Sequence, residues 1–217
     1  MRGLIEKDLR VLAKRKQYFL MFAGIALILA FTMDDTFIIS YVTMIGMVLA
    51  ISTISYDEAD NGLMFIMTLP VSRKQYAIEK HLFGYCTIVI SWILGLILQV
   101  ISSFFKGTFI DISSIFPGAL TYLGVFCLIL SVMVPIEIHF GMEKSRLAIF
   151  GIFGVCFAVG VLGSKITAFF NIDLAPAAAK LSAIPAPVLV LTGSVALVLI
   201  LSISIFLTIK SIEKKEF

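Results

Sequence analysis

The stretch Thr68-Leu69-Pro70-Val71-Ser72-Arg73-Lys74-Gln75-Tyr76 is a short polar interruption between two long apolar segments. Pro70 lacks an N–H and restricts the residue before it, so a helix over residues 58–67 is expected to end there. Ser72 and Gln75 have the spacing of a capping box, in which each side chain satisfies a backbone donor at the start of a helix. The stretch therefore predicts two helical pieces that meet in an elbow at Pro70.

The composition places this elbow in a membrane protein. Hydrophobic residues make up 60% and charged residues 14% of 217 positions, and the mean hydropathy is +1.07. A soluble core of this size does not bury so much apolar surface. A helix crosses ~30 Å of hydrocarbon with ~20 mainly apolar residues, and the apolar runs lack the alternation of a membrane barrel. We predict an all-α integral membrane protein, with a single transmembrane domain over 1–217 and six spans at about 18–33, 36–56, 83–104, 115–138, 147–164 and 187–209.

The basic residues predict the orientation of this bundle. Most of the 17 Lys and Arg residues precede the first span, lie in the second or fourth connection between spans, or follow the last span. Only Lys106, Lys165 and Lys180 fall on the opposite side. Because basic connections remain in the cytoplasm, we expect both termini to be cytoplasmic.

Residues 1–17 are expected to form an interfacial amphipathic helix. Lys7, Arg10 and Lys14 gather on one side at 100° per residue, and Asp8 weakens the apolar side. The apolar side consists of Leu4, Ile5, Leu9, Val11 and Leu12. Such a helix would lie along the membrane surface and contact a partner; the alternative is an ordinary basic anchor. No small-residue cleavage site follows the first span, so we interpret the segment as part of the mature protein.

Two segments, TLPVSRKQYAIEKHL (68–82) and LIEKDLRVLAKRK (4–16), resemble the permease subunits of bacterial ABC-2 type exporters. The resemblance is to the small six-span exporters of antimicrobial peptides and phenol-soluble modulins. The family signature is matched by Leu69, Pro70, Val71, Ser72, Arg73 and Lys80. It implies a plasma-membrane permease that dimerises with a second copy or a paralogue and couples to separate ATP-binding subunits. This chain has no G-x-x-x-x-G-K-[ST] phosphate loop, so ATP and magnesium are expected in the partner.

The resemblance also implies two cytoplasmic coupling elements that dock the ATP-binding subunit. The first is expected to use Met64, Phe65, Leu69, Pro70, Val71, Ser72, Arg73 and Lys74. The second, in the connection over residues 139–146, would use Met142, Glu143, Lys144 and Arg146. For either element the alternative is a connection that only enforces topology. Short extracellular re-entrant helices are expected at about 165–187, where the alternative is an external cap without a gating role.

The sequence shows no catalytic or metal-binding constellation. His81 and His139 lie at membrane edges outside any metal-binding pattern, and the three Cys residues have no ligand spacing. Glu137 is the one acidic residue within an apolar run, which makes it a candidate functional group; the alternative is a solvated or ion-paired boundary residue. We predict no enzyme activity, cofactor, metal or nucleic-acid partner for this chain.

Few charged groups lie within the predicted spans, which favours an amphipathic or lipid-like cargo, such as a peptide, over an ion. Two other functions remain open. Half of a secondary transporter would require coupling-ion groups and internal repeats. A membrane scaffold or immunity protein would transport nothing. Co-purification of an ATP-binding protein would distinguish the exporter from both.

Overall fold

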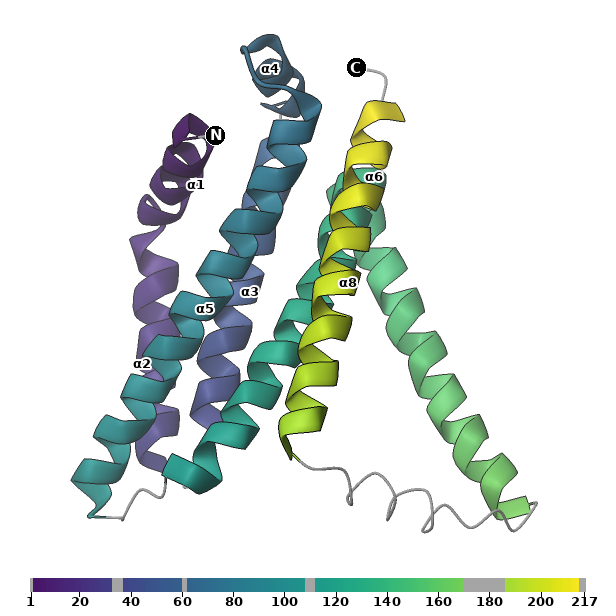
Figure 1. Ribbon diagram of the computed structural model, residues 1–217. Coiled ribbons are helices and arrows are strands. Elements are labelled where there is room, and N and C mark those ends of the chain that lie inside the picture. Colours follow the sequence, from purple (N-terminus) through teal and green to yellow (C-terminus); the bar gives the residue numbers. More distant parts are fainter. Residues whose placement is uncertain (1, 33–36, 60–61, 108–111, 170–185, 215–217) are drawn as a thin grey trace.

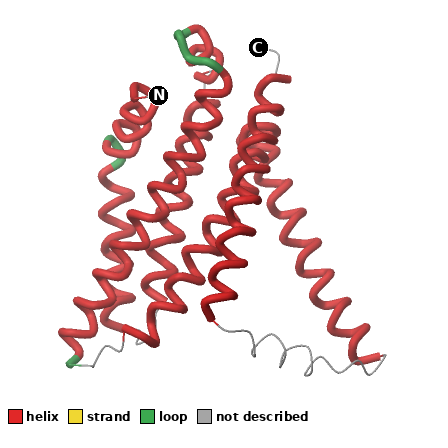
Figure 2. Tube along the Cα trace, in the orientation of Figure 1, coloured by secondary structure: helices red, strands yellow, loops and turns green. Residues whose placement is uncertain are grey.

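The computed structural model describes residues 2–32, 37–59, 62–107, 112–169 and 186–214, in which all regular secondary structure is helical (Figures 1 and 2). The helices are α1 (Arg2–Ala13), α2 (Lys16–Thr32), α3 (Phe37–Glu58), α4 (Gly62–Thr68), α5 (Arg73–Lys106), α6 (Ile112–Phe169) and α8 (Ala186–Lys214). Both termini lie at the same end of the bundle, which also carries α1 and α4 (Figure 1). We call this the terminal end. The predicted all-helical class is confirmed for the described residues.

Among the described residues, four helical segments are long and apolar enough to cross a membrane: Phe37–Glu58, Arg73–Lys106, Ile115–Gly141 and Leu191–Glu213. The pair α1 and α2, bent by 69°, would add a fifth as one broken span. Helices also cover the other predicted spans, but α2 has only 17 residues. Six spans therefore remain a prediction.

The elbow between α4 and α5 has the predicted local structure. Ser72 is extended, with φ −76° and ψ 149°. Its Oγ accepts a hydrogen bond from the Gln75 N–H at 3.2 Å, and Gln75 Oε1 accepts one from the Ser72 N–H at 3.1 Å. Helix α4 ends at Thr68, two residues before Pro70, but it begins at Gly62 and not at the predicted residue 58, because Glu58 is the last residue of α3. The capping box and the proline thus set the boundary between the two helices.

Helices α3 and α5 pack closely along the centre of the bundle. A Cβ placed on Gly95 would lie 3.0 Å from Ile39 Cα, and one on Gly46 would lie 2.1 Å from Ser91 Oγ. Small residues at helix contacts allow two backbones to come this close. In membranes such close packing helps helices to associate, because the hydrophobic effect does not drive them together there. Near the terminal end, the core also receives Leu4 from α1 and Ile66 from α4. The short helices at this end are therefore parts of the bundle core.

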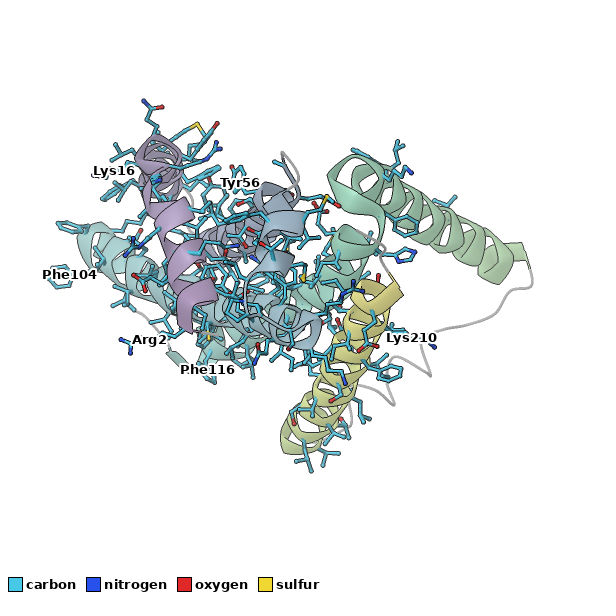
Figure 3. The ribbon with its side chains drawn as sticks, turned by 90° about the horizontal axis from the view of Figure 1, so that it is seen from above. Arg2, Lys16, Tyr56, Phe104, Phe116 and Lys210 are labelled. Atoms are coloured by element: carbon cyan, nitrogen blue, oxygen red, sulfur yellow. The ribbon has the colours of Figure 1, made fainter. Side chains whose placement is uncertain are left out.

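Helix α6 consists of two arms that meet at Gly141. The residue has φ 79° and ψ 169°, a conformation that essentially only glycine adopts. The first arm packs with α8, and the second arm leaves the bundle at an angle (Figures 1 and 3). The predicted connection at 139–146 is thus a sharp turn between helical arms. Of the predicted re-entrant region at 165–187, residues 170–185 lie outside the described part of the chain.

Candidate functional site

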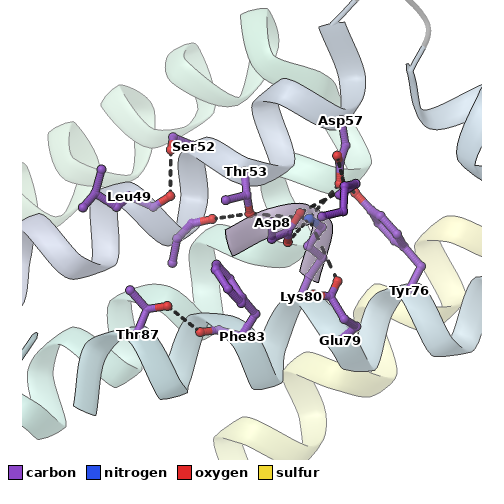
Figure 4. Close-up of polar contacts among 12 residues, drawn as sticks. Asp8, Leu49, Ser52, Thr53, Asp57, Tyr76, Glu79, Lys80, Phe83 and Thr87 are labelled. Carbon is purple, nitrogen blue, oxygen red and sulfur yellow. Dashed lines mark hydrogen bonds and ion pairs between the residues drawn. The ribbon is translucent and has the colours of Figure 1, made fainter. Parts of the chain in front are cut away.

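A cluster of charged residues, all buried except the half-buried Lys7, joins α1, α3 and α5 near the terminal end (Figure 4). We call Lys7, Asp8, Asp57, Glu79 and Lys80 the charge cluster. Lys80, on α5, lies at its centre: its fully buried Nζ is 2.5 Å from Asp8 Oδ2 and 2.7 Å from Asp57 Oδ2. A buried charge is costly unless it is paired and hydrogen bonded. The two carboxylates, one on α1 and one on α3, supply that pairing to a single lysine.

Further donors surround Asp57. The Tyr76 hydroxyl donates to Asp57 Oδ2 at 3.1 Å, and the Lys7 ammonium donates to Oδ1. Lys7 Nζ is also 3.0 Å from Asp8 Oδ1. Three donors from α1 and α5 therefore converge on one carboxylate at the end of α3, which fixes the position of α1 against both helices.

Glu79 differs from the other members of the cluster. Its side chain is fully buried, and neither carboxyl oxygen has a hydrogen-bond partner among the described residues. The nearest cation is Lys80, whose Nζ lies 4.0 Å from Oε2. The cluster thus sets two ammonium groups against three carboxyl groups, with Glu79 at its edge.

The predicted apolar face of α1 requires a correction. The buried residues of α1 are Leu4, Asp8 and Leu12, which lie four residues apart on one side. Leu9, assigned to the apolar side, is 56% exposed. Asp8, interpreted as weakening the pattern, is the centre of the buried face, because Lys80 pairs with it. A carboxylate flanked by leucines at both i−4 and i+4 is the sequence signal that was missed.

The basic residues predicted on α1 have different environments. Lys7 belongs to the charge cluster, and Lys14 is exposed at the break between α1 and α2. Arg10 Nη2 is 2.5 Å from Glu6 Oε1 one turn away, and both side chains are exposed. Contact of this helix with the membrane surface stays a prediction.

The elbow has an inner and an outer apolar face. Leu63 and Ile66 are buried in the core, and half-buried Val71 packs against the same core. On the outer face, Met64 is 46%, Phe65 68% and Leu69 43% exposed; Pro70 and Ser72 are exposed beside them. Three of the four apolar residues predicted for docking therefore point away from the bundle at its terminal end.

The two basic residues at the elbow are not equivalent. Arg73 Nη1 donates to the backbone oxygens of Ile212 at 3.1 Å and Glu213 at 2.8 Å. These carbonyls lie in the last turn of α8, where a helix leaves its acceptors unsatisfied. Lys74 is 67% exposed, and its Nζ lies 4.0 Å from Glu213 Oε1. Arg73 thus joins the elbow to α8, whereas Lys74 is accessible from outside.

The second predicted coupling element begins next to the end of α3. A Cβ on Gly141 would lie 2.8 Å from Glu58 Oε1, so the carboxylate at the end of α3 sits at the start of the second arm of α6. A negative charge at a helix N-terminus is favourable. Lys144 is exposed on this arm, and the side chains of Met142, Glu143 and Arg146 lie outside the described part of the structure.

Glu137 lies between α3 and the first arm of α6. It is buried, and Oε1 accepts a hydrogen bond from Ser55 Oγ at 2.7 Å. Among the described residues Glu137 forms no ion pair, and a hydroxyl from α3 contacts it instead. No group of three or more potential metal ligands occurs among the described residues.

Long apolar helices, with the charge cluster near the end that carries both termini, define a polytopic helical membrane protein. The model of the ABC-2 family transporter proteins matches residues 3–213. The chain belongs to this family and is the membrane component of an ABC-2 transporter, without a catalytic domain. The family implies an ATP-binding partner subunit. No curated protein and no solved structure matches the chain.

Proposed function

We propose that this chain is the permease subunit of an ATP-driven exporter in a bacterial plasma membrane. It pairs with a second copy or a paralogue, and a separate subunit that holds ATP and magnesium docks on its terminal end. Both termini face the cytoplasm, in keeping with the distribution of basic residues. The cargo is an amphipathic or hydrophobic molecule, such as a peptide.

The outer face of the elbow is the observation that carries this proposal. Met64, Phe65 and Leu69 are exposed at the terminal end, beyond the long apolar segments. Exposed apolar side chains gathered on an ordered element are typical of protein interfaces, and large apolar anchors often contribute most of the binding energy. Lys74 lies next to this face and supplies a charge that sets orientation more than affinity.

The inner contacts of the elbow explain how docking could move the membrane helices. Ile66 packs in the core with residues of α3, α5 and α6, and Arg73 holds the end of α8. Glu58 connects the end of α3 to the turn at Gly141. A displacement of the elbow by the ATP-binding subunit would therefore reach α8 through Arg73, and α3 and α6 through the shared core and Glu58.

The docking proposal is tested by Phe65→Glu in the full chain expressed with its native partners. A charge in an apolar contact is expected to cost at least about 2 kcal/mol of binding, a reduction of roughly thirtyfold or more. Co-purification of the ATP-binding subunit should fall accordingly. Phe104→Glu, at an exposed position of the opposite end of α5, is the matched control. Equal co-purification by the two variants would contradict docking on the elbow.

The cargo is tested separately by ATP hydrolysis of the reconstituted complex. An amphipathic peptide should stimulate hydrolysis, whereas small ions should not, because few charged groups lie in the spans. Stimulation by ions alone would contradict the proposed cargo class without affecting the docking site.

A further inference from the structure

An open groove runs between the first arm of α6 and α8, on the side of the molecule away from α1. Its volume is about 510 Å³, within the range of pockets that hold small organic ligands. Val132, Ile136, Ile203 and Leu207 are among its apolar walls. The groove is separate from the elbow and from the charge cluster.

The polar groups of this groove are unevenly distributed. Lys210, Ser211 and His139 lie at the end nearest the terminal end, and Ile200 lies at the other. His139 Nδ1 and Ser211 Oγ are hydrogen bonded at 2.8 Å. Lys210 projects outward from α8 (Figure 3) and forms no ion pair with a described carboxylate. One end of the groove is therefore cationic, and the remainder is apolar.

The floor of the groove contains two serines whose hydroxyls are already used within the protein. Ser204 Oγ lies 2.5 Å from the Ser131 backbone oxygen, to which it donates, and 2.9 Å from His81 Nε2. Ser131 Oγ donates to the backbone oxygen of Cys127 at 2.7 Å. A ligand of this groove thus finds apolar contacts below it and needs no hydrogen-bonding groups along its length.

The length of the groove matches one leaflet of a bilayer. From Ile200 to Lys210, α8 rises about 15 Å at ~1.5 Å per residue. A hydrocarbon core of ~30 Å has leaflets of about the same length. Lys210 directly follows the predicted span 187–209, so its ammonium group is expected at the level of the lipid headgroups.

We propose that this groove binds an anionic phospholipid, with an acyl chain between α6 and α8 and the phosphate at Lys210 and His139. A basic group at the end of an interhelical groove is the arrangement that recognises acidic headgroups. An acyl chain suits the apolar walls and the two serines, because the serine hydroxyls already have hydrogen-bond partners within the protein. The charge and the apolar length together select an anionic lipid over a zwitterionic one.

The test uses native mass spectrometry of the full chain, released from bilayers that contain equal amounts of phosphatidylglycerol and phosphatidylcholine. The wild-type chain should retain phosphatidylglycerol preferentially. Lys210→Gln should lower this preference about fivefold, the effect of one interfacial positive charge. Lys210→Arg keeps the positive charge at the same position and should leave the preference unchanged.

A second pair of variants tests the apolar part. Leu207→Trp fills the groove and should abolish lipid retention, whereas Leu199→Trp, on the same helix and similarly exposed but outside the groove, should not. Equal retention of the two lipids by the wild-type chain would overturn the proposal. An unchanged lipid preference in Lys210→Gln would also overturn it. The same holds if Leu207→Trp displaces a second copy of the chain or a peptide instead of a lipid. None of these measurements requires the ATP-binding subunit.

Discussion

Lys80 belongs both to the sequence motif at the elbow and to the buried charge cluster. It is one of the residues through which the sequence resembles the permeases, and in the structure its buried ammonium group pairs with Asp8 and Asp57 from two other helices. Breaking a buried ion pair leaves charges without compensation, which costs more than the pair itself contributes. The packing of α1 therefore depends on this side chain.

Lys80→Met tests this dependence. It keeps the length of the side chain but leaves two buried carboxylates without their lysine, so we expect a loss of about 3–5 kcal/mol in stability. Thermal unfolding in detergent, followed by circular dichroism, measures the loss. Adding Asp8→Asn to the variant should recover part of it, because paired residues are not additive. If the double variant is less stable by the sum of both single losses, the pair is not coupled.

Arg73 and Lys74 are predicted to behave differently although they are neighbours. Arg73→Ala removes charge-assisted hydrogen bonds to two carbonyls of α8, each worth about 1.5–3 kcal/mol. The substitution should therefore increase amide hydrogen exchange in the last turn of α8. Lys74→Ala loses only an exposed contact at 4.0 Å and should leave this exchange unchanged. Equal protection of α8 in both variants would show that Arg73 does not hold it.

The elements of this protein differ in how far local sequence determines them. The boundary at Pro70 and the capping box of Ser72 were predicted because their rules involve neighbours within four residues. The pairing of Asp8 with Lys80 was not, since it depends on the rotation of α1 and α5 about their axes. The Gly141 turn was expected only as a connection, because glycine alone does not specify a conformation.

Gly141→Ala tests the turn between the arms of α6. Alanine at φ 79° and ψ 169° is strained by about 1–3 kcal/mol, and its Cβ would collide with the Glu58 carboxylate. We expect lower thermal stability of the purified chain. Gly151→Ala, on the second arm with no atom within 4 Å, is the control and should be neutral or slightly stabilising. A neutral effect at Gly141 would mean that α6 does not turn there.

At the scale of the whole molecule, the charge cluster and the elbow lie at the end that carries both termini (Figure 1). The charge cluster joins α1, α3 and α5; the elbow adds α4 and α8; Glu58 adds the second arm of α6. The opposite end of α5 bears exposed apolar residues such as Phe104. This polarity fits a membrane component that receives force at one end and moves its helices in response.

Photo-crosslinking in native membranes tests docking on the elbow most directly. A photoreactive amino acid at Phe65 should form a covalent adduct with an ATP-binding protein that contains a phosphate loop, and the same group at Phe104 should not. Binding of the nonhydrolysable form of ATP should change the yield at Phe65. The account would be contradicted if position 65 gave no such adduct in a membrane-inserted chain, or if positions 65 and 104 gave it equally.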